Sequence, residues 1–263
     1  MFIDFHTHVF PDRISKSAID KLSTSGGIPA FTDGSLSDTL QKMSDAGVDR
    51  MVALSIATNP KQQTNVNSFA ISIKSERVIP FGSVHPDSEN IVSDIKLLHA
   101  NGIKGIKIHN EYQNADILDR RYMPAYELCE KLGMVMIFHA GRDIAFKPPV
   151  KASPERIRKL SEMFKDLTIV AAHLGGWCAW DQVERELVGT NVYLDTAYIS
   201  SYIDPQVCKR IIFNHGVDKI LFGSDCPWEL PSKTISFIES LGLSDEDKQK
   251  IYHLNAQKLL GEI

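Results

Sequence analysis

The histidines are the residues of this sequence best suited to chemistry, because most of them share one kind of position. Of the nine histidines, those at the ends of short apolar runs are His6, His8, His85, His109, His139 and His173. Imidazole nitrogens bind transition metals, and a neutral imidazole also exchanges protons near pH 7. Their repeated placement after apolar runs predicts one site for metal binding or proton transfer.

The first apolar run ends in a close pair, His6 and His8. Residues two apart on a β-strand project to the same side, so both imidazoles can reach one ion. Asp4 is expected on that side, deeper in the fold, where its carboxylate would orient a ligand histidine. Ile3 and Phe5 are expected to face outward and pack against helices. The alternative is a pair of hydrogen-bonded polar residues in a turn.

Three more polar residues follow later apolar runs. His139, His173 and Asp225 come directly or closely after the runs at 134–138, 168–172 and 219–222. A lone histidine in such a place is usually a neutral, hydrogen-bonded group. Together with the first pair, however, these residues favour a shared metal site.

The elements that must position these residues alternate along the chain. Apolar or β-branched runs predict strands at 2–5, 50–56, 78–84, 103–108, 134–138, 168–172, 192–194 and 219–222. Apolar spacings of three and four predict helices at 36–46, 89–99, 121–132, 154–164, 182–187 and 205–213. Repeated strand and helix predict a parallel sheet covered by helices.

Eight such units in 263 residues predict an α/β fold of one domain, a (β/α)₈ TIM barrel over residues 1–263. The carboxyl ends of the strands carry the active site in such barrels, which would gather the histidines at one mouth. An open doubly wound sheet is disfavoured, because the first turn lacks the glycines of a dinucleotide-binding loop. Residues 11–33 are expected to form an insertion loop that shapes or covers the site.

The composition of the chain limits the kinds of binding partner that we expect. The chain has 43% hydrophobic residues and a net charge of −4, so it has no broad basic field for nucleic acid or an anionic membrane. No run approaches the roughly 18 apolar residues of a membrane span, and the first residues do not resemble a signal peptide. The four cysteines lack a C-x-x-C pair, which predicts reduced thiols and a cytoplasmic location. A small-molecule substrate is expected, and a homodimer is compatible with these features.

The motifs together resemble a known family. They are D-x-H-x-H at 4–8, G-x-K-G-x-K-x-H at 102–109, F-H-A-G at 138–141, H-L-G-G at 173–176 and F-G-S-D-x-P-W at 222–228. Their order is similar to that of the amidohydrolase superfamily. Within it, the chain resembles the amidohydrolase-related branch that includes aminocarboxymuconate semialdehyde decarboxylase and resorcylate-type decarboxylases.

This resemblance implies a ligand set and catalytic residues. It assigns His6, His8 and His139 to one divalent metal per chain, usually zinc, with Asp225 as a further ligand. Asp225 and His173 would be catalytic, His173 by contacting the metal-bound water or the substrate oxygen. Three or four nitrogen and oxygen ligands leave an open position on zinc, which agrees with that role.

The fourth strand leaves a second arrangement open. Lys107 and His109 are two residues apart and share a side of the strand. Some binuclear relatives place a carboxylated lysine here to bridge two metals, so a second metal held through Lys107 is an alternative. We favour a single metal, with His109 lining the substrate pocket.

Substrate-binding residues are expected on the loops after the strands. The Arg142 guanidinium suits a substrate carboxylate. Trp177 and Trp228 would wall an apolar or aromatic substrate, or else pack over the rim of the barrel.

Three functions are compatible with these residues. The first is hydrolysis of a small, carboxylate-bearing molecule by a metal-activated water, with His173 stabilising the oxyanion and Asp225 shuttling the proton. The second is nonoxidative decarboxylation at the same mononuclear site. A noncatalytic metal-binding barrel is the third, and the excess of polar groups at the strand ends disfavours it.

Overall fold

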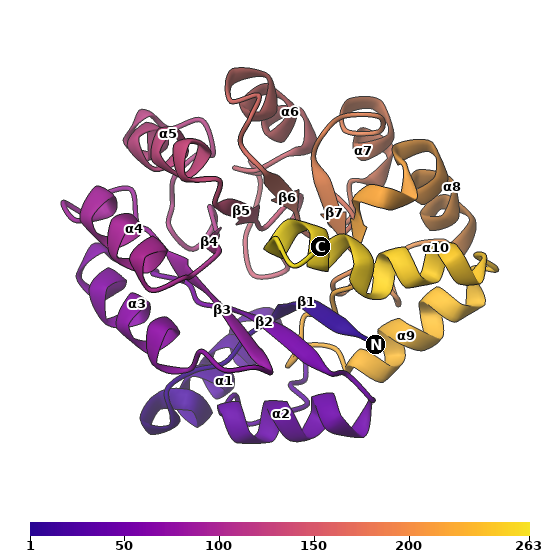
Figure 1. The fold of residues 1–263 in the computed structure, drawn as a ribbon, viewed down its shortest axis with the longest axis horizontal. Coiled ribbons are helices and arrows are strands. Elements are labelled where there is room, and N and C mark those ends of the chain that lie inside the picture. Colours follow the sequence, from indigo (N-terminus) through magenta and orange to yellow (C-terminus); the bar gives the residue numbers. More distant parts are fainter.

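Eight parallel strands follow one another around a barrel in the computed structural model, which describes residues 1–263 (Figure 1). They are β1 (Ile3–Thr7), β2 (Arg50–Leu54), β3 (Val78–Ser83), β4 (Gly105–Ile108), β5 (Val135–Phe138), β6 (Ile169–Ala171), β7 (Tyr193–Asp195) and β8 (Ile220–Leu221). Every neighbouring pair from β1–β2 to β7–β8 is parallel. Each strand lies within or beside a run predicted from the sequence.

The sheet closes where β8 meets β1. The Phe5 N–H donates to the Phe222 carbonyl at 2.7 Å, and the His8 N–H donates to the Cys226 carbonyl at 2.7 Å. Thr7 and Cys226 also form a parallel bridge. These bonds confirm the predicted TIM barrel and bring the residue after β8, Asp225, beside the histidines of β1.

The helices surround the barrel (Figure 1). They are α1 (Asp12–Gly26), α2 (Leu36–Asp45), α3 (Gln63–Ser72), α4 (Ile91–Ala100), α5 (Met123–Leu132), α6 (Pro154–Met163), α7 (Trp180–Glu186), α8 (Pro205–His215), α9 (Pro231–Ser240), α10 (Asp245–Gln249) and α11 (Asn255–Leu260). A π-helical turn over Lys250–Leu254 joins the last two. None of these helices is both long and apolar enough to cross a bilayer.

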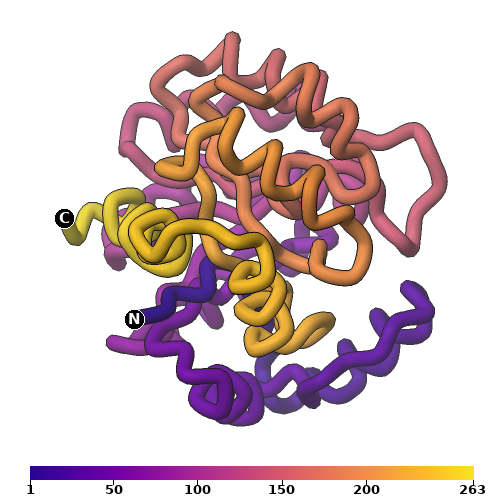
Figure 2. Tube along the Cα trace, turned by 90° about the vertical axis from the view of Figure 1, so that its right-hand side faces the viewer, coloured from indigo at the N-terminus to yellow at the C-terminus, as the bar shows by residue number.

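The core has an inner and an outer layer. The inner layer fills the barrel with side chains from β1, β2, β3, β5, β6 and β8 and is capped by Ala256 and Leu260 of α11. Phe5 and Phe81, from strands that are not neighbours, meet inside it with ring centroids 5.8 Å apart. The two chain ends lie together at this capped end (Figure 2). The opposite end, where the strands finish, is left for the polar residues.

A bulge in β1 corrects the expected orientation of its side chains. Ile3 and Phe5 belong to the inner layer, so the expectation that they face the helices is wrong. Strict alternation would then turn His6 outward. The register between β1 and β2 shifts between Asp4 and Thr7, which is the signature of a bulge, and His6 lies inside the barrel mouth with 1% exposure.

The segment 11–33 is largely a helix rather than the predicted loop. α1 covers Asp12–Gly26 and ends at Gly27, which adopts the left-handed conformation that glycine tolerates. A Cβ placed on Gly26 would lie 3.2 Å from Cγ2 of Ile144, in the loop after β5. Figure 2 shows α1 and that loop projecting on the same side of the molecule. The segment is therefore largely a helix next to the loop after β5, and its role in shaping or covering the site stays a prediction.

Candidate metal centre

Three of the predicted ligands come together at the mouth of the barrel. Nε2 of His6 lies 3.3 Å from Oδ1 of Asp225, and Nε2 of His8 lies 3.2 Å from the same oxygen. The side chains are 1%, 12% and 10% exposed for His6, His8 and Asp225. Since the potential ligand atoms all lie within 4.8 Å of one another, the three can surround one ion.

The hydrogen bonds on the far side of each ring fix which nitrogen faces this point. Nδ1 of His6 lies 2.8 Å from Oδ2 of Asp195, and Nδ1 of His8 lies 3.0 Å from the Leu54 carbonyl. A carboxylate or carbonyl oxygen can only accept, so Nδ1 carries the proton in each neutral ring. Both Nε2 lone pairs then face the Asp225 carboxylate without a proton between them. Convergence of acceptors on one point fits a divalent cation such as zinc or manganese.

Asp195 has the role that the sequence assigned to Asp4. Asp195 is fully buried at the end of β7, orients the His6 ring and also accepts the His173 N–H at 2.8 Å. Asp4 instead accepts the Ser224 N–H at 3.0 Å and the His6 N–H at 3.1 Å. Burial raises the pKa of each carboxyl to about 7. The prediction for Asp4 is therefore wrong, because the bulge turns it toward the β8 turn.

Backbone geometry at the strand ends is unusual. Asp225 has φ 68° and His173 has φ 60°, a region that side-chain-bearing residues rarely adopt. Such residues cost on the order of 1–3 kcal/mol each and cluster at functional sites. Gly223 does not have a positive φ, but the backbone there lies close to β1. A Cβ on Gly223 would lie 2.9 Å from Cβ of His6. The turn after β8 is thus shaped to hold Asp225 against β1.

Lys107 reaches the same centre from β4. Its side chain is among the largest fully buried ones, and Nζ lies 3.3 Å from Nε2 of His6. Burial lowers the pKa of Lys107 to about 8. Lys107 therefore contacts the candidate centre through His6. A second metal held through Lys107 stays a prediction.

His173 and His139 form a hydrogen-bonded pair beside the first three ligands. Nδ1 of His173 lies 2.9 Å from the Ala197 carbonyl, and its Nε2 lies 3.0 Å from Nδ1 of His139. Burial and neighbouring charge lower the pKa of both histidines to about 3. Nε2 of His139 faces the Arg142 carbonyl at 3.1 Å. His139 is therefore not turned toward Asp225, and its role as a ligand with His6 and His8 stays a prediction.

His139 belongs instead to a second group of potential ligands with His109 and Asp143. The rings of His109 and His139 stack with centroids 4.2 Å apart. His85 joins neither group, because its Nδ1 accepts the Asp87 N–H at 3.2 Å at the end of β3. Asp143 was missed in the sequence, although its spacing of four residues from His139 was visible.

Aromatic side chains lie around this mouth. The Trp177 ring lies 5.0 Å from Tyr202 and 6.3 Å from Tyr198, and Phe146 lies 5.0 Å from Tyr112. The loops after β5 and β6 are joined at Gly141, where a Cβ would lie only 2.3 Å from the Trp177 nitrogen. Only glycine fits at position 141, so this residue allows the close contact between the two loops that positions Trp177.

Arg142 and Trp228 are the other residues expected to bind substrate. Arg142 is exposed, and its guanidinium makes no ion pair or hydrogen bond within the chain. The Trp228 N–H donates to the Asp225 carbonyl at 2.8 Å, which places it one turn after the ligand. Both lie on loops at the carboxyl ends of the strands, as predicted.

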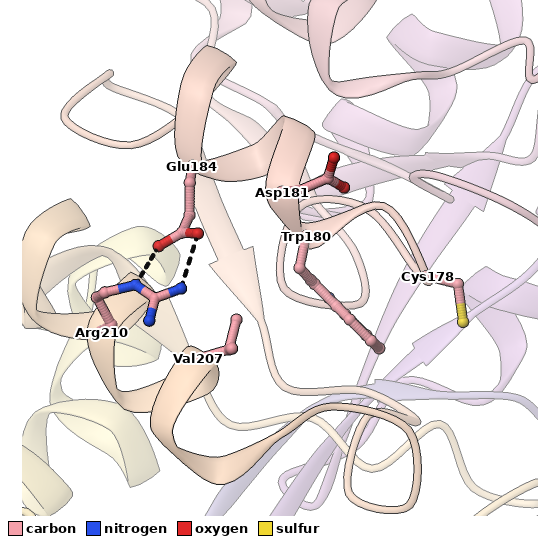
Figure 3. Close-up of a pocket in the computed structure, with 6 residues that line it drawn as sticks. All are labelled: Cys178, Trp180, Asp181, Glu184, Val207 and Arg210. Atoms are coloured by element: carbon pink, nitrogen blue, oxygen red, sulfur yellow. Dashed lines mark hydrogen bonds and ion pairs between the residues drawn. The ribbon is translucent and has the colours of Figure 1, made fainter.

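A separate cavity of about 430 Å³ lies between α7 and α8 (Figure 3). Its lining consists of Cys178, Trp180, Asp181, Glu184, Val207 and Arg210. The Arg210 guanidinium pairs with Glu184 at 2.6 Å, and Trp180 donates from Nε1 to the His173 carbonyl at 3.2 Å. This cavity has no histidine, so the candidate centre is the histidine cluster and not this cavity.

The family model described as amidohydrolase matches residues 3–261. The chain belongs to the amidohydrolase family. This confirms the resemblance drawn from the motifs and makes the protein an enzyme of the amidohydrolase family. No curated protein matches the sequence.

Solved structures agree with the amidohydrolase barrel. An uncharacterized TIM-barrel protein from Bordetella bronchiseptica is similar at 20% identity and TM-score 0.78, over 99% of this chain and 98% of that one. A 5-carboxyvanillate decarboxylase from Sphingomonas paucimobilis is similar at 14% and 0.70, over 99% and 98%. A dihydroxybenzoic acid decarboxylase from Polaromonas sp. JS666, with bound manganese, is similar at 15% and 0.72, over 99% and 96%. At these identities the likeness shows the fold.

Proposed function

We propose that this amidohydrolase-family enzyme is a nonoxidative decarboxylase of a small aromatic carboxylate. The observation that carries the proposal is the composition of the loops at the mouth, which carry one unpaired guanidinium, Arg142, and the aromatic rings of Tyr112, Phe146 and Trp177. Aromatic side chains and a free guanidinium suit a planar aromatic acid. The decarboxylases among the fold neighbours act on such acids, which supports the same choice here.

The cofactor we propose for this reaction is a divalent cation, zinc or manganese, held by His6, His8 and Asp225. Two imidazole nitrogens and one carboxylate oxygen are donors that both metals accept. When bound, the cation supplies Lewis acidity that polarises an oxygen of the substrate. His139, which the family motif assigns to the same ion, lies next to the cluster and is turned away from it.

The chain's own residues would bind the acid and manage one proton. The bond between the ring carbon and the carboxylate breaks, its electron pair stays on the ring carbon, and a proton replaces the departing CO₂. Asp225 and His173 are the groups at the mouth that we propose move this proton. The Nδ1–H of His173 is fixed on Ala197, so exchange is confined to the Nε2 side of that ring.

Hydrolysis is the second candidate, and one observation favours it. Asp225 presents Oδ1 to both imidazoles, and Oδ2 has no hydrogen-bond partner in the chain. A free carboxylate oxygen beside the ligands is suited to accept a proton from an attacking water. Both reactions would use the same residues, so only the products separate them.

Isotopic solvent provides the deciding experiment. The purified protein, loaded with Mn²⁺ or Zn²⁺ and checked by metal analysis, is given ortho-hydroxybenzoic acids and, separately, small lactones and esters. Decarboxylation in D₂O releases CO₂ and leaves one deuterium on the product ring. Hydrolysis in H₂¹⁸O leaves one ¹⁸O in the product and releases no CO₂. Heavy oxygen incorporation without CO₂ would overturn the decarboxylase proposal.

We also propose that the enzyme works in a reducing compartment such as the cytoplasm. Its four cysteines are all free thiols, and Cys129, Cys208 and Cys226 are buried. Burial raises the pKa of the Cys129 thiol to about 12, which keeps it unreactive. Buried, protonated thiols without disulfides are typical of reducing compartments.

A further inference from the structure

We propose that the mouth contains a second divalent-cation site, formed by His109, His139, Asp143 and the main-chain carbonyl of Arg142. It differs from the His6–His8–Asp225 centre and from a metal bridged through Lys107. No part of it depends on which reaction the enzyme catalyses.

The donor atoms converge. Nε2 of His109 lies 3.2 Å from Oδ2 of Asp143, and Nε2 of His139 lies 3.8 Å from that oxygen. The Arg142 carbonyl lies 3.1 Å from Nε2 of His139. The three side-chain donor atoms lie within 4.8 Å of one another. With small movements, each of them can therefore lie at the distance of about 2.0–2.2 Å from one shared zinc ion that such ligands adopt.

The tautomers of these rings place two hydrogen-bond acceptors face to face, with no proton between them. A cation is the group that suits the space between two such acceptors. The Ala197 carbonyl can only accept, so His173 donates from Nδ1 and its Nε2 is an acceptor. His139 must then donate from Nδ1 to His173, which leaves its own Nε2 without a proton. That lone pair faces the Arg142 carbonyl oxygen, which is also an acceptor. Two facing acceptors repel unless a cation lies between them.

A purely structural role explains this cluster poorly. Nδ1 of His109 is buried and has no hydrogen-bond partner, so no hydrogen bond from behind fixes this ring. Asp143 is only 10% exposed, yet no lysine or arginine neutralises its charge. A bound cation would neutralise the carboxylate.

The donor set also indicates the kind of cation. Two imidazoles, one carboxylate and one carbonyl oxygen suit a borderline divalent ion such as Mn²⁺ or Zn²⁺. Since Asp143 and Arg142 belong to the loop after β5, binding would attach that loop to β4 through His109. The loop carries Phe146, so the second cation would also fix one aromatic wall of the mouth.

Cation stoichiometry tests the proposal without any substrate. The chelator-treated protein is titrated with Mn²⁺ alone by calorimetry, and bound metal is counted by elemental analysis after equilibrium dialysis. We expect two ions per chain for the unmodified protein and one for Asp143→Asn or His109→Ala. Asp181→Asn, which removes an exposed carboxylate on α7, is the matched control and should retain two.

The outcomes separate the two centres. His8→Ala should also bind one ion, and adding Asp143→Asn to it should leave none. His139 is not used as the test, because the family motif assigns it to the first centre and its loss removes an ion under either assignment. One ion per chain in the unmodified protein, or two in both Asp143→Asn and His109→Ala, would overturn the second site. Retention of the first ion by Asp143→Asn shows that this variant is folded.

Discussion

The two histidine clusters at the mouth are built in different ways. In the first, His6 and His8 follow β1, and both rings are held from behind by buried acceptors, Asp195 and Leu54. In the second, Asp143 is on a loop, and the far nitrogen of His109 has no hydrogen-bond partner. Both clusters leave acceptors facing acceptors, yet only the first has both of its imidazole rings held from behind.

This difference in construction predicts a difference in affinity for a cation. A ligand ring that is already oriented loses little freedom on binding, whereas a loop must be ordered when the ion arrives. The first cluster should therefore bind a cation tightly and the second more weakly and exchangeably. Four variants test this difference. They remove metal ligands, a proton-transferring group, an orienting group and a loop side chain, and their expected effects on metal binding or turnover decrease in that order.

The largest effect is expected from removing both histidines of β1. His6→Ala combined with His8→Ala leaves Asp225 as the lone ligand, so the tightly bound cation and turnover should both be lost. Elemental analysis after dialysis measures the metal. His253→Ala, which removes a histidine that bonds Gln257 away from the mouth, is the control. A double variant that still holds its tight ion would show that the first cluster is not the metal centre.

His173→Ala should have the next largest effect, on turnover rather than on the first cation. Loss of an acid–base or oxyanion-stabilising group typically lowers kcat by about 10² or more. The tight ion should stay, because His173 contacts Ala197 and His139 and none of the first three ligands by hydrogen bond. Unchanged kcat with full metal content would remove His173 from the catalytic residues.

The sequence was enough to predict the barrel but not the fine geometry of either cluster. Eight apolar runs with helices between them have few ways to bury both faces, and that constraint is local and visible. The bulge between Asp4 and Thr7 has no such signal, because it arises from pairing with β2. Because of it, Ile3 and Phe5 face the barrel interior together with His6, and Asp4 bonds Ser224 rather than a histidine ring.

The second cluster escaped prediction for a related reason. His109 and His139 were found because they end strands, and strand ends meet in a barrel. Asp143 is in the loop after β5, whose path is set by the Gly141–Trp177 contact with the next loop. Contacts between loops depend on tertiary packing, so a ligand on such a loop is identified only once the fold is known.

Asp195→Asn should sharpen the comparison, because it changes the carboxylate oxygen that orients the His6 ring and touches no residue of the second cluster by hydrogen bond. Removing the partner of a ligand histidine typically weakens metal binding by about 10–100-fold. Competition with a chromogenic chelator would measure this at the tight site, and the weak site should be unaffected. Asp94→Asn is a suitable control, since Asp94 is also buried but bonds Gln63 near α3. Equal loss in both variants would indicate a general effect of losing a buried carboxylate.

Arg142 gives the smallest and most discriminating effect, because its two ends serve different purposes. Its carbonyl faces His139, and its guanidinium is free. Arg142→Ala keeps the carbonyl, so the second ion should remain while KM for a carboxylate substrate rises about tenfold, the loss of one charge-assisted contact, with kcat little changed. Lys159→Ala on α6 is the control for surface charge. If Arg142→Ala instead released the second ion at unchanged KM, the loop would act through its fold rather than through the guanidinium.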